Sequence, residues 1–81
     1  MDRTMSLLET VIITVNIPDK GVLAGDLGTI VELYTNPDLA YEVEFVSPDG
    51  STRALLTLAP SQVRRLMPAD VLTTRQLPLA A

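Results

Sequence analysis

The chain has 81 residues, 47% of them hydrophobic and only three of them aromatic, and its net charge is −4. A single domain of this size buries too small a share of its surface for a deep substrate cleft, and its core must be aliphatic. The acidic balance disfavours nucleic-acid binding, and the lack of Cys and His excludes disulfide scaffolds, thiolate metal sites and histidine-dependent catalysis.

Residues 7–15 are rich in β-branched side chains and predict a first strand, with Val11, Ile13 and Val15 on its core face. Turn-forming residues then predict a loop over 16–26, longer than an ordinary hairpin turn. A long loop here is the usual binding edge of a small barrel. The residues expected to fold back over the end of the barrel are Ile17, Val22 and Leu23.

The turn Gly25-Asp26-Leu27-Gly28 leads into a second predicted strand, 27–34. Glycine accepts positive φ angles and lets two backbones pass closely, so Gly25 and Gly28 fit a chain that enters a tightly curved sheet. Asp26 is either a ligand or catalytic acid or, as we predict, a structural residue that bonds nearby backbone N–H groups. The turn does not match a phosphate cradle, because a strand and not a helix follows it.

Three further strands are predicted. Alternation is cleanest over 40–46, and a Pro-Asp-Gly turn at 47–50 joins this strand to 51–58. Leu56 and Leu58 share one face of that fourth strand and Leu55 lies on the other, which predicts burial on both faces over part of its length.

A 3₁₀ turn at 59–63 and a short strand at 64–66 beside the first strand complete the pattern. Strict alternation over 27–34 places Ile30 and Leu33 on opposite faces. The prediction is an all-β protein, a small five-stranded SH3-like barrel at 7–66, with an N-terminal extension at 1–6 and a C-terminal tail at 67–81.

Three blocks carry a family resemblance: 25–32, 41–45 and 54–58, the last followed by Pro60 and Gln62. In this order they resemble a family of short bacterial proteins known as domain of unknown function 4926, over roughly residues 7–66. The glycine-rich turn alone is also similar to the KOW motif of ribosomal proteins and transcription elongation factors, and to the barrel of the nitrile hydratase β subunit. All of these imply an SH3-like barrel, and none implies catalytic residues.

The resemblance also suggests functions. Relatives encoded beside toxin-like or nuclease-like proteins imply an antitoxin or immunity role, the nitrile hydratase likeness implies an accessory or regulatory subunit, and the KOW likeness implies a nucleic-acid binder. The net charge argues against the last of these.

Carboxylates are the remaining candidates for catalysis or metal binding. Glu42 and Glu44 share one face of a predicted strand, and Glu32 is expected on the neighbouring strand. They form either an acid–base pair or hard-cation site, or, as we predict, the solvated outer face of a half-buried sheet. We therefore predict no catalytic residues, no metal and no cofactor.

Arginines and tyrosines are the candidate partner contacts. The arginines at 53, 64 and 65 either anchor an acidic partner or pair with Glu42 or Glu44 across strands. Tyr34 and Tyr41 flank the turn at 36–38 and either stack on a peptide or fill the core. In the tail, Val71, Leu72, Leu77 and Leu79 are too apolar for a solvated end, which predicts packing on another protein or on a second copy.

The sequence therefore predicts a non-enzymatic protein-binding module. Its expected partner is another protein, either a co-encoded one or, through the tail, a second copy of this chain. No apolar run approaches the roughly 20 residues of a membrane span, and the first residues lack the layout of a secretory signal, so we expect a cytoplasmic protein. The predicted partner-binding residues are Ile17, Leu23, Tyr34, Tyr41, Arg53, Arg64, Arg65, Val71, Leu72 and Leu77.

Overall fold

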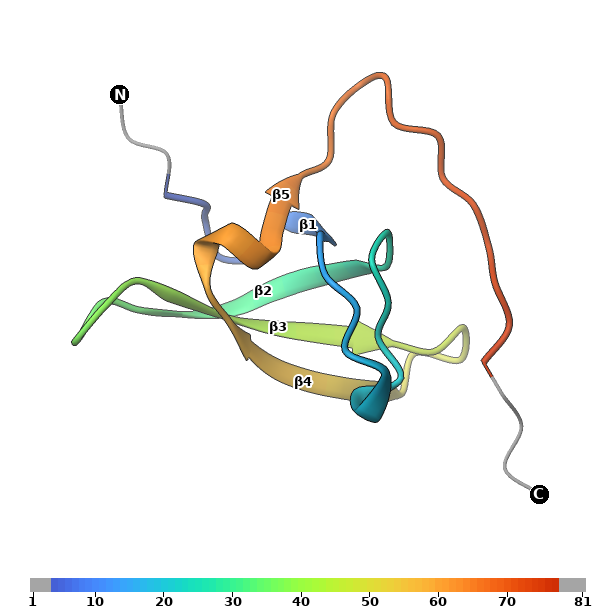
Figure 1. Cartoon of the computed structure of the whole chain (residues 1–81), viewed down its shortest axis with the longest axis horizontal. Helices are drawn as coiled ribbons and strands as arrows, with labels where there is room; N and C mark the ends of the chain where they lie inside the picture. Colours follow the sequence, from blue (N-terminus) through green and yellow to red (C-terminus); the bar gives the residue numbers. More distant parts are fainter. Residues whose placement is uncertain (1–3, 78–81) are drawn as a thin grey trace.

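Five antiparallel strands form one sheet in the computed structural model, which describes residues 4–77 (Figure 1). Part of the predicted N-terminal extension and Leu79 of the tail lie outside the described residues. The all-β prediction is confirmed. The elements are β1 (Thr10–Ile13), the 3₁₀ turn η1 (Pro18–Lys20), β2 (Leu27–Tyr34), β3 (Ala40–Val46), β4 (Thr52–Leu58), the 3₁₀ turn η2 (Pro60–Gln62) and β5 (Val63–Arg65).

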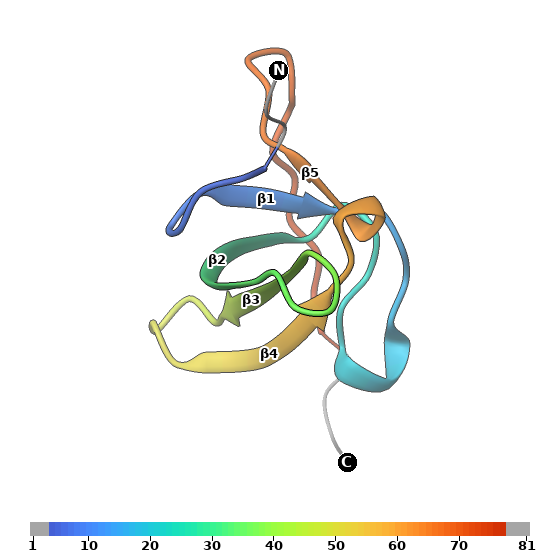
Figure 2. The same ribbon diagram turned by 90° about the vertical axis from the view of Figure 1, so that its left-hand side faces the viewer.

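The strands lie in the order β4-β3-β2-β1-β5, so consecutive hairpins build most of the sheet and β5 returns to pair with β1. The sheet curls strongly, which brings η2 and the start of β5 over its concave side (Figure 2). Pairing between strands ends at β4 on one side and at β5 on the other. Closure of the barrel between these two strands remains a prediction.

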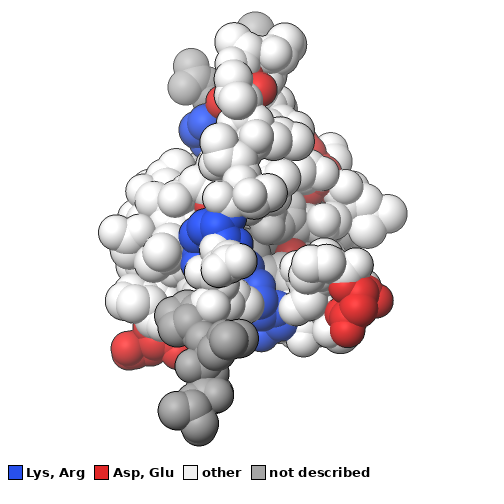
Figure 3. Space-filling view, turned by 90° about the vertical axis from the view of Figure 1, so that its right-hand side faces the viewer, with Lys and Arg blue, Asp and Glu red and all other residues white. Residues whose placement is uncertain are grey.

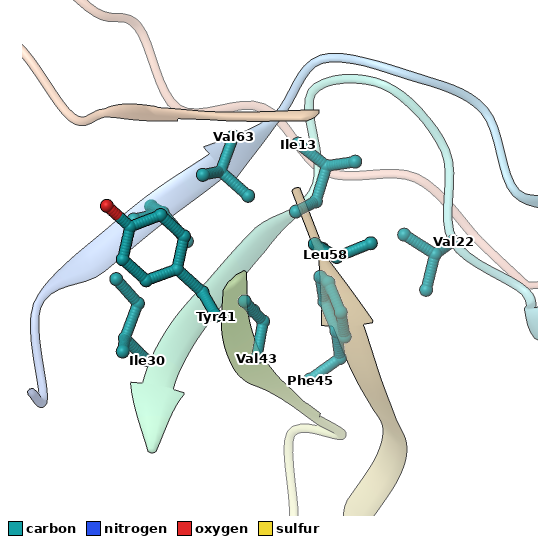
Figure 4. Close-up of a cluster of buried hydrophobic side chains, with 9 residues drawn as sticks. Ile13, Val22, Ile30, Tyr41, Val43, Phe45, Leu58 and Val63 are labelled. Atoms are coloured by element: carbon teal, nitrogen blue, oxygen red, sulfur yellow. The ribbon is translucent and has the colours of Figure 1, made fainter. Parts of the chain in front are cut away.

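The core lies on the concave side of the sheet (Figure 4). Every strand contributes to it, and the loop after η1 adds one fully buried side chain, Val22. The phenol of Tyr41 is 1% exposed, and its oxygen accepts a hydrogen bond from the Met5 amide at 3.1 Å. The buried cluster consists of Val11, Ile13, Val22, Ile30, Tyr41, Val43, Phe45, Leu58 and Val63.

The first strand is shorter than predicted. Residues 6–9 form a turn instead, in which the Glu9 carboxylate accepts a hydrogen bond from the Ser6 amide and Leu8 takes a φ of 66°. Leu7 and Leu8 are exposed there. The β-branched residues that predicted the strand begin only at Thr10, and the local hydrogen bonds of Ser6 and Glu9 favour a turn before it.

A β-bulge interrupts the alternation of β2. Ile30 pairs with Val43 and Glu32 pairs with Glu42, so Val31 is an extra residue without a partner on β3. Because of this extra residue, Ile30 and Leu33 both pack on the core, and the prediction that they lie on opposite faces is wrong.

The fourth strand is buried on one face only. Leu58 is 3% exposed and Leu56 packs against the core, whereas Leu55 is 52% exposed. The prediction of burial on both faces is wrong, because Leu55 and Thr57, which point away from the core, are both exposed.

Candidate functional site

The turn before β2 is held by its own aspartate. Gly25 has a φ of 97°, a left-handed conformation that favours glycine. Its amide donates to the Ile13 carbonyl at 2.8 Å, and an oxygen of the Asp26 carboxylate accepts from the Leu23 amide at 3.0 Å. Asp26 therefore fixes the turn through a carboxylate that is itself largely shielded from solvent.

Gly28 plays a different part from Gly25, because its backbone has no positive φ. It is buried, and a Cβ atom at this position would lie 2.4 Å from Cγ1 of Val43 and 3.0 Å from Cε1 of Phe45 on the neighbouring strand β3. Only a residue without a side chain lets β2 pass so close to the core.

A second bulge directs Arg53 toward Asp26. Phe45 pairs with Ala54 and Val46 pairs with Thr52, so Arg53 is the extra residue on β4. Its guanidinium lies 5.8 Å from the centre of the Phe45 ring, donates to the Gly21 carbonyl and approaches the Asp26 carboxylate at 3.6 Å. Bulges commonly re-aim a side chain in this way.

The C-terminal tail supplies a second arginine to the same carboxylate. Arg75 donates from Nε to Oδ1 of Asp26 at 2.9 Å and from Nη2 to Oδ2 at 2.5 Å, and Nη2 also lies 3.0 Å from the Gly21 carbonyl. This is the two-pronged geometry in which guanidinium binds carboxylate most strongly. The tail is thus attached to the turn that precedes β2.

The two arginines keep Asp26 ionised. Its side chain is only 12% exposed, and this desolvation raises the carboxyl pKa. Hydrogen bonds from Arg75 and the Leu23 amide, with the positive charges of Arg75 and Arg53, lower the pKa by more. The net effect is a pKa below the ordinary value, so the Asp26 carboxylate is ionised at neutral pH and lies between two positively charged guanidinium groups.

A groove runs between the tail and the sheet. One pocket of about 280 Å³ lies beside Asp26, Arg53 and Arg75, and a second of about 140 Å³ lies beside Arg64 and Asp70. Gly25, Leu27 and Thr73 line both pockets, so the two pockets are neighbours between the tail and the sheet, and together we call them the groove. Figure 1 shows the tail, in orange to red, running past the turn before β2 toward the β3–β4 hairpin, and Figure 3 shows basic side chains gathered in the middle of this face.

The tail adopts neither helix nor strand over residues 71–77. At its start, Arg64 of β5 binds the Asp70 carboxylate through two nitrogens, at 2.9 and 3.0 Å, and the Asp70 carboxylate also accepts from the Met67 amide at 2.6 Å. Between Asp70 and Arg75 the apolar side chains face solvent, and Val71 is 84% exposed. Polar contacts at the two ends therefore hold the tail on the groove.

A family model described as a domain of unknown function, DUF4926, matches residues 7–65. The chain belongs to the DUF4926 family. No curated protein and no solved structure matches it significantly. The DUF4926 match contains Asp26 and Arg53 but ends before Arg75, so the carboxylate and the first arginine lie in the family domain and the second arginine follows it.

Arginines of the DUF4926 domain do not pair with Glu42 or Glu44 as the pairing alternative predicted. Arg64 binds Asp70, and Arg65 binds the Glu9 carboxylate at 2.7 Å and the Thr4 carbonyl at 3.2 Å. The two glutamates accept hydrogen bonds from threonines of β4 instead, and Arg53 is directed toward Gly21 and Asp26.

Those glutamates lie on the outer face of the DUF4926 sheet. Glu42 accepts a hydrogen bond from Thr57 at 2.5 Å, and Glu44 accepts one from Thr52 at 2.6 Å. Glu32 lies opposite Glu42 in the register of β2 and β3. Within residues 4–77, no group of three or more His, Cys, Asp or Glu side chains is arranged to hold a metal ion. Nor does any helix in residues 4–77 have the length and apolar character to cross a membrane.

The other predicted partner contacts are scattered. The prediction that Tyr41 contacts a partner is wrong. Its ring is buried in the core, and its hydroxyl oxygen accepts a hydrogen bond from the Met5 amide. Tyr34 is exposed at the end of β2, and Ile17 packs against the core. Five of the predicted contacts line the groove: Arg53, Arg64, Val71, Leu72 and Leu77. Leu23 does not line it, but its amide donates to the Asp26 carboxylate, which does.

Arg75 is the residue of the groove that the sequence did not reveal. It is a single basic residue in a tail whose apolar residues show no regular spacing, and its partner Asp26 lies 49 positions earlier in the chain. The one available signal is that Asp70 and Arg75 are the only charged residues after the last strand.

Proposed function

We propose that this DUF4926 protein is a non-enzymatic protein-binding module that works in the cytoplasm as an antitoxin-like or immunity-like partner of a co-encoded protein. The observation that supports the proposal is the tail itself, because residues 71–77 lie against the sheet without helix or strand of their own, and Arg75 is bound there to Asp26. A surface that binds an extended segment of its own chain offers the same groups to a segment of another protein.

The charge of the chain supports a basic partner. The net charge of −4 gives the whole molecule a negative field, and such a field speeds the encounter with a positively charged protein. Proteins that act on nucleic acids carry basic surfaces, so an acidic protein that covers such a surface would block their action.

The test is co-expression with the product of the neighbouring reading frame. We expect that product to be toxic when expressed alone, to lose its toxicity when this chain is present, and to co-purify with this chain on an affinity tag. An unrelated acidic protein of similar size and charge is the control, because it separates specific binding from charge attraction.

Failure of the two proteins to form a complex would refute the proposal. A complex with a non-toxic enzyme whose activity depends on this chain would instead favour the accessory-subunit alternative.

A further inference from the structure

We propose that the Asp26 carboxylate, the Gly21 carbonyl and the adjoining groove form a receptor for an arginine side chain on an extended segment of the partner protein. Residues 71–77 of the chain itself occupy this receptor until the partner displaces them. This inference rests on the proposed function, since it names the part of the partner that the module would recognise.

The receptor selects guanidinium over ammonium. Arg75 contacts three acceptor atoms at once, Oδ1 and Oδ2 of Asp26 and the carbonyl oxygen of Gly21. The planar fork of arginine meets both carboxylate oxygens in parallel, whereas the compact charge of lysine does not. An arginine is therefore the side chain that this set of acceptors fits.

The receptor stays assembled when the tail leaves. Asp26 has two partners that do not belong to the tail: the Leu23 amide donates to it, and Arg53 lies 3.6 Å from the same carboxylate and donates to the Gly21 carbonyl. Asp26 is thus never left as an unpaired, largely buried charge, which would be costly. Exchange of one arginine for another requires no rearrangement of the sheet.

The tail is held weakly enough to be exchanged. Its apolar side chains Val71 and Leu72 are 84% and 62% exposed, so little hydrophobic burial resists displacement. Its ion pair with Asp26 is partly exposed, with 32% of the Arg75 side chain accessible. The turn closed by Arg64 and Asp70 lies outside the part that must move.

A partner segment has room for contacts that the tail does not make. The pocket of about 280 Å³ beside Arg75 has an apolar wall formed by Leu27, Val46 and Pro48, and Leu27 and Val46 are exposed in the presence of the tail. A segment that carries an arginine and a larger apolar side chain would fill this space and so compete with residues 71–77.

The experiment uses the full chain with Arg75→Gln, which frees the receptor, and a synthetic peptide of residues 68–77 as the probe. We expect this variant to bind the peptide about tenfold more tightly than the wild-type chain, whose own tail competes for the site. A matched peptide with glutamine in place of the arginine should bind neither chain.

Two further variants in the Arg75→Gln background locate the site. Asp26→Asn keeps an oxygen to accept from the Leu23 amide but removes the charge, and it should abolish peptide binding. Asp38→Asn makes the same change of net charge in the turn between β2 and β3, far from the tail in Figure 1, and it should leave binding unchanged. Thermal melts of each variant show that it is folded.

Equal binding of the two peptides, or no binding of the arginine peptide by the Arg75→Gln chain, would overturn the inference. So would a dimer of the wild-type chain that Arg75→Gln abolishes, because a second copy would then be the occupant. A co-encoded partner captured equally well by the wild-type and Asp26→Asn chains would overturn the receptor but leave the proposed function standing. Peptide binding at Asp26 without any such partner would support the receptor and refute the proposed function.

Discussion

Replacing Gly28 with alanine should destabilise the fold, although alanine usually suits a strand better than glycine. The new Cβ would lie 2.4 Å from Cγ1 of Val43, 3.0 Å from Cε1 of Phe45 and 3.2 Å from the Glu44 carbonyl oxygen. Ordinary carbon–carbon contacts are about 3.5–4.0 Å, so the strands must separate or the core must shift. Overpacking of this kind costs about 1–3 kcal/mol, against a gain of about 0.5–1 kcal/mol from replacing glycine.

The midpoints of these ranges give a net loss of about 1 kcal/mol, and their extremes allow up to about 2.5 kcal/mol. For a domain of this size a loss of about 1 kcal/mol lowers the melting temperature by about 4–8 °C. Circular dichroism during thermal unfolding measures it. Valine at the same position adds two further methyl groups beside Val43 and Phe45 and should lower the melting temperature by more than alanine does.

A double-mutant cycle with Val43→Ala identifies the cause. That substitution removes Cγ1, the atom nearest to the new Cβ, so the loss in the double variant should be smaller than the sum of the two single losses by about 1 kcal/mol or more. Strictly additive losses, or a Gly28→Ala chain as stable as the wild type, would show that Gly28 is not required for the close approach of β2 to the core.

Three other predictions concern stability. The folded-state pKa of Asp26 lies below its ordinary value near 3.8, so the ion pairs of Asp26 stabilise the fold fully above that value and are lost as the pH falls through the folded-state pKa. The stability difference between wild type and Asp26→Asn, from urea titrations, should thus be largest above about pH 5 and shrink below about pH 4; a constant difference would contradict this. Leu58→Ala should cost about 2–5 kcal/mol and Leu55→Ala within about 0.5 kcal/mol, because only the first side chain is buried, and similar melting temperatures would count against the assigned faces of β4. Tyr41→Phe should cost about 0.5–1.5 kcal/mol through loss of the acceptor for the Met5 amide, and a melt that does not change would show that this bond contributes nothing.

The sequence predicted the strands well where the pattern was local. The predicted ranges 27–34 and 40–46 coincide with β2 and β3, because turn residues bound both segments and each keeps most of its alternation. The bulges at Val31 and Arg53 could not be predicted, since a bulge depends on how one strand pairs with its neighbour.

In the candidate site, too, contacts between residues close in sequence could be predicted and contacts between distant segments could not. The hydrogen bond between the Asp26 carboxylate and the Leu23 amide spans three residues and follows from the chemistry of turns. The contact between Asp26 and Arg75 joins the turn to a distant tail, and no periodicity or motif connects the two. Arg53 was singled out from its charge, but its direction depends on the bulge in β4.

The bulge in β2 also has a consequence for comparing DUF4926 sequences. Val31 is the extra residue of this strand, so a chain that lacks it would keep Ile30 and Leu33 facing the core in simple alternation. Loss of one residue between Gly28 and Ile30 would instead reverse which side chains face the core on one side of the deletion. Single-residue gaps in alignments of the family should therefore fall at position 31, and their presence would mark members whose sheet bends less sharply at this strand.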